Sequence, residues 1–202
     1  MSGYFKAGPS ARLFDLREAA VLLKPLRRIL ISGMLGCGKT YLTKQIVAQA
    51  AAEGEAVLVL DFFGEFRELA GDFVWVYEDV EQLDYFLDVV EDVAKNWRKT
   101  LVVFDEVHQY TQPGEIPGWL LTKFIKLFRR SRHWNLEFIC ISQGVVDVPP
   151  RIRRLIEEFW YFATTEISDL EIVRKRWGDL TAETISGLPD RSFLKLFSRR
   201  RL

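Results

Sequence analysis

Short apolar segments alternate with amphipathic ones along most of the chain. The apolar segments are rich in Val, Ile, Leu and Phe, as expected of strands buried on both faces of a parallel sheet. They lie at residues 27–32, 56–60, 73–77, 100–104, 136–141, 159–163 and 192–197. Between them, apolar residues recur every three or four positions, which predicts helices over residues 41–53, 79–97, 118–131 and 166–177. Pro149 and Pro150 are predicted to open a further short helix. This alternation predicts an α/β fold with a mostly parallel central sheet flanked by helices.

The N-terminal residues follow a different pattern. Ser10 is a suitable helix cap, and Leu13, Leu16 and Leu23 share one face of a helix predicted over residues 11–24, before Pro25 ends it. We therefore expect residues 1–26 to form an N-terminal segment with a helix. Residues 27–202 are expected to form a single domain, because no linker or low-complexity segment interrupts them.

Composition narrows the class of protein. Hydrophobic residues make up 49% of the 202 and charged residues 28%, which is typical of a folded globular chain. The 28 Lys and Arg balance the 28 Asp and Glu, and this neutrality weighs against a dedicated nucleic-acid-binding protein unless cations gather locally. No apolar run is long enough to cross a bilayer, and no signal peptide is recognisable, so a cytoplasmic location is expected.

A glycine-rich stretch between the first predicted strand and the following helix has the spacing G-x-x-x-x-G-K-T, which is typical of a phosphate-binding loop. Its glycines allow successive backbone N–H groups to face one concavity, where the positive end of the helix adds to the attraction for phosphate. Lys39 is predicted to contact the β- and γ-phosphates, and the Thr40 hydroxyl to bind Mg²⁺. The residues expected to bind ATP are Gly33, Met34, Leu35, Gly36, Cys37, Gly38, Lys39, Thr40 and Tyr41.

Two further strands end in polar residues suited to nucleotide hydrolysis. The run at 100–104 ends in Asp105 and Glu106. Asp105 is predicted to support Mg²⁺ beside Thr40, and Glu106 to activate the water that attacks the γ-phosphate. Gln143 ends the next strand, where it is expected to contact the γ-phosphate or the attacking water. Each strand end alone is also consistent with solvated polar residues; their order after a phosphate-binding loop favours catalysis.

These motifs together resemble those of the FtsK/HerA superfamily of RecA-like P-loop ATPases of the ASCE type. The resemblance covers roughly residues 27–197. It rests on the loop, on Asp61-x-x-Gly64-Glu65-Phe66, on Asp105-Glu106-Val107-His108, on Arg129-Arg130-Ser131-Arg132-His133 and on Ile141-Ser142-Gln143. The chain is similar in size to the genome-packaging ATPases of membrane-containing icosahedral viruses. It has no room for the additional barrel domain of HerA-type proteins, and this favours the packaging branch.

The resemblance implies a hexameric ring that moves double-stranded DNA by ATP hydrolysis. It also implies an arginine that acts in the neighbouring subunit's site: Arg132, with Arg129 or Arg130 as alternatives. DNA contact would be made to phosphates without sequence preference, since no base-reading motif is visible. The candidate segments for it are residues 108–117, Arg151, Arg153 and Arg154, and residues 199–201. A capsid vertex or a viral membrane protein is the further partner that a packaging ATPase would have.

Other functions remain open at this level. A HerA-like cellular DNA translocase would share the same motifs. A P-loop kinase or an assembly ATPase that does not act on DNA would share the loop. Glu106 and Gln143 suit attack by water better than phosphoryl transfer to a metabolite. A GTPase switch is disfavoured because the guanine-reading motif Asn-Lys-x-Asp is absent from the sequence.

Overall fold

The computed structural model describes residues 11–15, 28–97, 99–111, 114 and 116–198. Its strands form one sheet in the order β1-β8-β7-β2-β6-β5-β3-β4. The bounds of these strands are β1 Ala11–Asp15, β2 Arg28–Ser32, β3 Ala56–Leu60, β4 Val74–Tyr77, β5 Thr100–Phe104, β6 Leu136–Ser142, β7 Glu158–Phe162 and β8 Ser192–Phe197. The ladder from β4 to β7 is parallel throughout, and β8 pairs antiparallel with both β7 and β1. The predicted α/β fold with a mostly parallel sheet is therefore confirmed.

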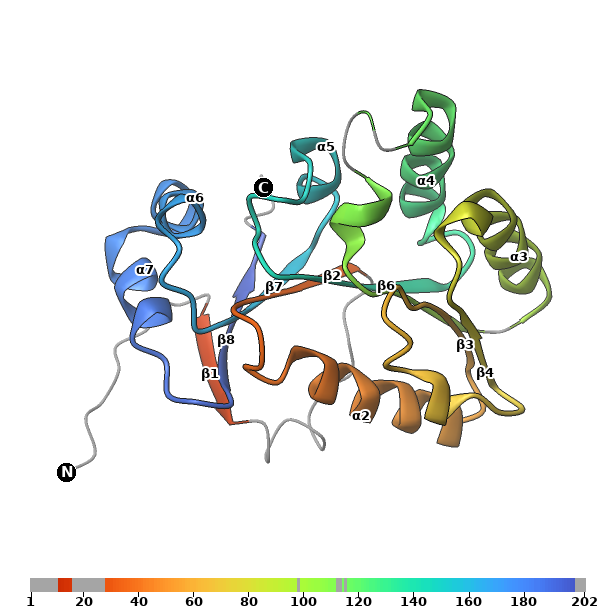
Figure 1. Ribbon diagram of the computed structural model, residues 1–202, viewed down its shortest axis with the longest axis horizontal. Coiled ribbons are helices and arrows are strands. Elements are labelled where there is room, and N and C mark those ends of the chain that lie inside the picture. The colour runs from red at the N-terminus through yellow and green to blue at the C-terminus, as the bar shows by residue number, and fades with distance from the viewer. Residues whose placement is uncertain (1–10, 16–27, 98, 112–113, 115, 199–202) are drawn as a thin grey trace.

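Helices cover both faces of this sheet (Figure 1). Helix α2 lies on one face, and α3, α4, α5 and α6 lie on the other, with α7 packed beside α6. Their bounds are α2 Lys39–Ala52, α3 Leu83–Asn96, α4 Gly118–Arg130, α5 Pro150–Arg153, α6 Ile167–Trp177 and α7 Asp179–Ser186. Short 3₁₀ turns occupy η1 Arg67–Leu69, η2 Val80–Gln82 and η3 Val107–Tyr110. None of the helices in the described part of the chain is long and apolar enough to cross a membrane.

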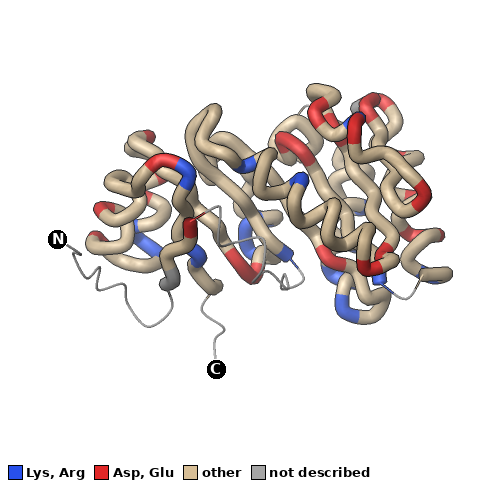
Figure 2. The backbone as a smooth tube through the Cα atoms, turned by 90° about the horizontal axis from the view of Figure 1, so that it is seen from below, with Lys and Arg blue, Asp and Glu red and all other residues tan. Residues whose placement is uncertain are grey.

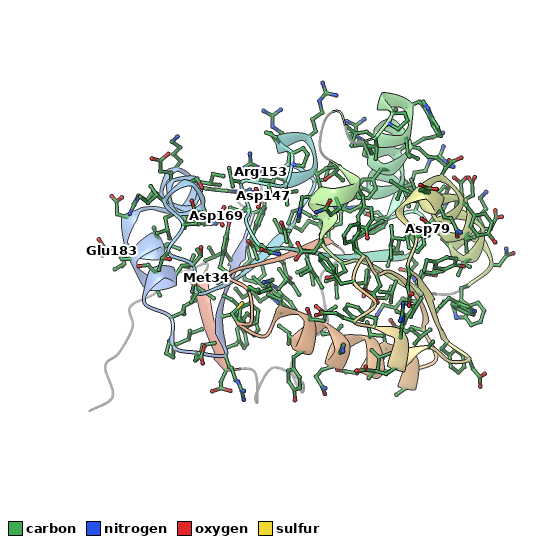
Figure 3. The ribbon with its side chains drawn as sticks, in the orientation of Figure 1. Met34, Asp79, Asp147, Arg153, Asp169 and Glu183 are labelled. Atoms are coloured by element: carbon green, nitrogen blue, oxygen red, sulfur yellow. The ribbon has the colours of Figure 1, made fainter. Side chains whose placement is uncertain are left out.

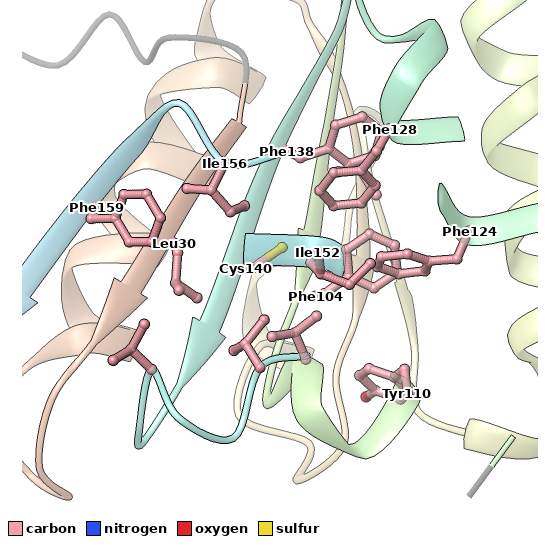
Figure 4. Packing of buried hydrophobic residues seen from close by; sticks show 14 of the residues in the cluster. Leu30, Phe104, Tyr110, Phe124, Phe128, Phe138, Cys140, Ile152, Ile156 and Phe159 are labelled. Atoms are coloured by element: carbon pink, nitrogen blue, oxygen red, sulfur yellow. The ribbon is translucent and has the colours of Figure 1, made fainter. Parts of the chain in front are cut away.

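Each central strand is buried on both sides, as its continuous apolar sequence predicts. Alternate residues of β3 and β5 point to opposite faces: Leu58 and Phe104 belong to the core beneath α3 and α4, whereas Val57 and Val103 belong to the core beneath α2. The larger core contains an aromatic group in which Phe128 stacks on Phe138 with ring centroids 4.2 Å apart (Figure 4). This packing holds α4 against the strands that end at the polar residues.

The helix predicted over residues 11–24 is wrong for its first part. Residues Ala11–Asp15 form β1, which pairs antiparallel with β8, and Phe14 stacks on Phe193 at 5.4 Å. The unpaired edge of β8 supplies hydrogen-bond partners that outweigh a weak local helical pattern in so short a segment. The remainder of that predicted helix, residues 16–24, lies outside the described residues. The domain boundary at residue 26 likewise stays a prediction.

The C-terminal third contains an element that the sequence pattern did not indicate. Helix α7 follows α6 after Gly178, whose φ of +97° turns the chain between them. Its buried side chains, Ala182 and Ile185, are too few to give a clear helical pattern in eight residues. The other strands and helices of residues 28–197 lie within a few residues of their predicted positions.

Replacing Phe128 by Ala is expected to lower the free energy of unfolding by about 3–5 kcal/mol, because the cavity would interrupt stacking against both Phe124 and Phe138. Urea denaturation followed by circular dichroism measures this loss. Tyr85, whose side chain is 59% exposed, is the matched control, and Tyr85→Ala is expected to cost less than about 1 kcal/mol. Similar losses for the two variants would contradict the assignment of this core.

Candidate functional site

The glycine-rich loop joins the end of β2 to the start of α2 at the sheet's carboxyl edge. Gly33 has φ +153°, and a Cβ atom there would lie 2.6 Å from the Cβ of Phe162 on the neighbouring strand β7. Gly38 caps α2 with φ +106°. Neither position tolerates a side chain, so the loop's curvature depends on glycine at both. The backbone N–H groups at the start of α2 consequently face the region outside the loop, as phosphate binding requires.

Lys39 is the first residue of α2, and its ammonium is held within the loop. Its Nζ donates hydrogen bonds to the carbonyl oxygens of Gly33 at 2.7 Å and Met34 at 2.8 Å. The residue is only 6% exposed. The thiol of Cys37 is also buried, and this burial raises its pKa, so Cys37 packs as a neutral side chain. The loop therefore carries one buried positive charge directed toward its own concavity.

A cavity of about 660 Å³ opens beside the loop, and we call it the nucleotide cavity. It combines residues from the loop, from the ends of β5 and β6, and from the segment after β3. Its lining residues are Leu35, Gly36, Gly38, Lys39, Thr40, Tyr41, Phe63, Glu65, Asp105, Glu106, Ile141 and Gln143. The residues predicted for the two motifs and Gln143 are thus brought together, whereas Gly33, Met34 and Cys37 support the loop from outside the cavity lining.

Asp105 is 3% exposed at the end of β5. Burial, and after it the neighbouring carboxylates of Glu106, Asp61 and Glu65, raise the pKa of its carboxyl to about 7. A carboxyl group in this position is ionised more readily when a cation is nearby. Mg²⁺ is commonly held by one or two carboxylates together with substrate phosphates, so Asp105 and the Thr40 hydroxyl, which line one cavity, fit this ion. The two residues would bind it jointly with the nucleotide.

Glu106 is contacted by two polar side chains. The Gln143 amide donates a hydrogen bond to Glu106 Oε1 at 3.1 Å, and His108 Nδ1 lies 3.2 Å from Glu106 Oε2. Glu106 itself has φ +47°, a left-handed conformation that is uncommon for a residue with a side chain. Strain of this kind persists where the surroundings hold a residue in place, and it is frequent at functional sites. The hydrogen bond from Gln143 orients one carboxylate oxygen at the cavity wall.

The segment after β3 contributes residues to which the sequence pattern assigned no role. Asp61 is fully buried, and its carboxylate accepts hydrogen bonds from the backbone N–H groups of Glu65 at 3.1 Å and Phe66 at 2.7 Å. These bonds fold the segment so that Phe63 and Glu65 reach the cavity. The motif Asp61-x-x-Gly64-Glu65-Phe66 was the feature of the sequence that pointed to this segment. In the structure, its Asp61 carboxylate holds the loop in shape through these two hydrogen bonds.

The three predicted arginines lie away from the nucleotide cavity of their own chain. Arg132 pairs with Glu157 at 3.0 Å, and the same carboxylate pairs with Arg28 at the amino end of β2. Arg130 lies over the ring of Trp134, with its Cζ 4.8 Å from the centroid. Since α4 ends where β6 begins, these residues lie at the opposite edge of the sheet from Glu106. Any contact with a nucleotide must therefore involve a second subunit.

Comparisons with known proteins agree with this fold and site. Residues 29–164 match the family model for the ATPase family associated with various cellular activities (AAA). The genome-packaging NTPase B204 of Sulfolobus turreted icosahedral virus 2, solved with ATP-gammaS, is 18% identical; the match covers 86% of this chain and 92% of that one, with a TM-score of 0.72. No curated protein sequence matches the chain.

Two solved structures from other systems are also similar. VirB4 of Thermoanaerobacter pseudethanolicus is 11% identical, with a TM-score of 0.68 and coverage of 86% of this chain and 87% of that one. The pCW3 conjugation coupling protein TcpA is 13% identical, with a TM-score of 0.63 and coverage of 97% and 65%. At these identities the likeness concerns the fold. The predicted resemblance to RecA-like P-loop ATPases of the FtsK/HerA type is confirmed at that level.

The metal-free protein is expected to become less stable as pH rises from about 4 to about 7. The native Asp105 carboxyl, with its raised pKa, binds a proton more tightly than the unfolded one, so ionisation penalises the folded state. Asp105→Asn is therefore expected to raise the free energy of unfolding at about pH 8 by roughly 1–3 kcal/mol, with little gain near pH 4. Denaturation at both pH values in the presence of a chelator tests this, with the exposed Asp72→Asn as control. Destabilisation by Asp105→Asn at the higher pH would contradict it.

Gln143→Ala is expected to lower kcat for ATP hydrolysis by about tenfold or more, because Glu106 loses its amide partner while the loop is untouched. Nucleotide affinity, measured with a fluorescent ATP analogue, is expected to change less than about twofold. Gln109→Ala is the matched control, since the Gln109 side chain contacts His108 and not the Glu106 carboxylate, and its backbone bond to Glu106 is unchanged by the substitution. Equal loss of affinity and of kcat in Gln143→Ala would indicate that Gln143 acts in binding.

Proposed function

The chain belongs to the ATPase family associated with various cellular activities, and from that premise we propose that it hydrolyses ATP to move double-stranded DNA through a ring of identical subunits. The observation that carries the hydrolytic part is the fixed carboxylate of Glu106, held at 3.1 Å by Gln143 in the cavity that also contains Lys39. Genome packaging is the task we propose for the ring, because B204 has that role and a similar fold.

The site residues divide the chemistry among them. The loop N–H groups and Lys39 bind the β- and γ-phosphates. Glu106 accepts a proton from the attacking water, and Gln143 orients that water and the carboxylate together. Thr40 and Asp105 would hold Mg²⁺, which supplies neutralisation of phosphate charge when bound. The aromatic ring of Phe63 borders the same cavity and limits access of bulk water.

Assembly is proposed because, among the residues that the structure describes, no arginine lines the nucleotide cavity. Arg132, with Arg129 or Arg130 as alternatives, would enter the site of the neighbouring subunit and neutralise charge developing on the γ-phosphoryl group. The position of these residues at the amino edge of the sheet supports action in a neighbour over action in the same chain. Arg132 would exchange Glu157 for phosphate as the ring forms, and a hexamer is the ring size that the FtsK/HerA resemblance favours.

DNA would be held by phosphate contacts repeated around the ring. Figure 2 shows basic and acidic residues dispersed over the fold, so attraction must come from local groups and not from net charge. Arg153 and residues 108–111 are candidates for these contacts, and residues 199–201 lie outside the described residues. A capsid vertex or a viral membrane protein would be the anchoring partner, with the host cytoplasm as the place of action. A HerA-like cellular translocase would use the same site, whereas a kinase or assembly ATPase would not need DNA.

The ATPase rate per subunit is expected to rise with protein concentration and with duplex DNA of any sequence. Arg132→Ala is expected to lower the rate at high concentration by about 100-fold. Lys175→Ala, on an exposed position of α6, is the matched control. Phosphate release measured over a hundredfold range of concentration provides the test. A rate independent of concentration, of DNA and of Arg132 would contradict the ring proposal and favour the kinase or assembly alternatives.

A further inference from the structure

A second cavity of about 390 Å³ adjoins the nucleotide cavity. Leu35 and Gln143 line both. The second cavity lies between the loops that follow β6 and β7, and its other lining residues are Met34, Gly144, Val146, Asp147, Thr164, Glu166, Ser168 and Asp169. Figure 3 labels three of these lining residues, Met34, Asp147 and Asp169. We call it the acidic recess, after Asp147, Glu166 and Asp169.

The acidic recess contains negative charge without a matching cation. None of its three carboxylates forms an ion pair within the described part of the chain. Asp169 is only 1% exposed; its Oδ1 accepts a hydrogen bond from the Val146 N–H at 2.8 Å, while its buried Oδ2 has no partner. Burial first, and then Asp147 and Glu166, raise the pKa of this carboxyl. An unpaired buried oxygen of this kind is costly unless a donor reaches it.

Two local features of the structure do not explain why Asp169 Oδ2 lacks a hydrogen-bond donor. Asp169 lies in the first turn of α6, where the helix dipole favours a negative charge. That accounts for one carboxylate but supplies no donor to Oδ2. The loop also holds the acids close together: a Cβ on Gly144 would lie 2.6 Å from Asp147 Oδ2 and 3.4 Å from Asp169 Oδ1. Carboxylates arranged in this way match the several N–H donors of one guanidinium group.

The same chain carries a complementary surface. A third cavity, of about 540 Å³, lies between α4 and α5 and is lined by Thr122, Ile125, Lys126, Arg129, Arg151, Arg154 and Leu155. We call it the basic recess. Its four cations are exposed, and none forms an ion pair within the residues that the structure describes. Elsewhere most charged side chains near these helices are paired, as Lys123 is with Asp88 at 2.8 Å.

We propose that the acidic recess binds an arginine from the basic recess of a second copy of this chain, in a head-to-tail contact beside Gln143. The inference rests on the proposed function, since it assumes a ring. In this contact the arginine pairs with carboxylates. Arg132, by contrast, is proposed to act on the nucleotide, so the two proposals concern different residues and different sites. Because different surfaces meet, the contact is heterologous and repeats from subunit to subunit. Docking also touches the loop that carries Gln143, and so links assembly to the orientation of Glu106.

A charge-reversal pair tests this contact. The acid-reversed protein carries Asp147→Lys and Glu166→Lys, at positions that are not fully buried; the base-reversed protein carries Arg151→Glu and Arg154→Glu. With a non-hydrolysable ATP analogue and no DNA, each is expected to self-associate at least about 30-fold more weakly than the unmodified protein in sedimentation velocity. An equimolar mixture is expected to self-associate more tightly than either reversed protein alone, because the intact pair of recesses alternates with a reversed pair that again carries opposite charges. Glu183→Lys and Lys175→Glu are controls at exposed sites and are expected to assemble normally.

Nucleotide binding separates the competing outcomes. Affinity for a fluorescent ATP analogue is expected to stay within about twofold in both reversed proteins. A large loss of affinity with unchanged assembly would overturn the inference and assign the acidic recess to the nucleoside. Normal assembly of both reversed proteins would overturn the inference alone, leaving the ring intact. An unmodified protein that stays monomeric with nucleotide would overturn both the ring and this contact.

Discussion

The register of the parallel sheet brings Glu106, Gln143 and the glycine-rich loop to one place, and the candidate site depends on it. Phe104 of β5 lies opposite Cys140 of β6, and Ser32 of β2 lies opposite Ser142 of β6. The residues that follow these strands therefore leave the sheet side by side at one edge. Glu106 and Gln143 meet at 3.1 Å for this reason, and the glycine loop after Ser32 opens beside them. A shift of one residue in either ladder would turn these side chains to the other face.

Charge at this edge is arranged for a ligand and not for the stability of the isolated chain. Asp105 is buried among three further carboxylates, and its raised pKa records the cost of that placement. Lys39, the buried cation of the loop, hydrogen-bonds to carbonyl oxygens instead of pairing with an acid. A triphosphate with a divalent cation satisfies both groups at once, because it brings negative charge to the lysine and positive charge to the carboxylates. Binding and the stability of the fold are thereby coupled.

Acidic and basic groups are separated between the two edges of the sheet and between the helices that cover it, and this separation bears on assembly. The residues proposed for hydrolysis lie at the carboxyl edge, whereas Arg132 lies at the amino edge beside Glu157. The unpaired acids of the acidic recess and the unpaired cations of the basic recess lie on different elements, α6 and its preceding loops for one, α4 and α5 for the other. Under our proposal, these complementary groups would be satisfied where two copies of the chain meet. This is the physical basis on which we connect the ATPase site to a ring.

Features that depend on neighbours along the chain could be predicted from the amino-acid sequence. The loop at 33–40, the buried strands and the acids after β5 follow from local spacing and apolar runs, and these predictions of fold agree with the structure. Tertiary contacts decided the rest. Residues Ala11–Asp15 became a strand because β8 offered an open edge, and Gly33 is required because Phe162 approaches from β7. Asp147 and Asp169 share a recess only after β7 pairs with β2, which brings the start of α6 beside the loop that follows β6. Sequence spacing carries no record of such contacts, since they are made between segments that the chain brings together only on folding.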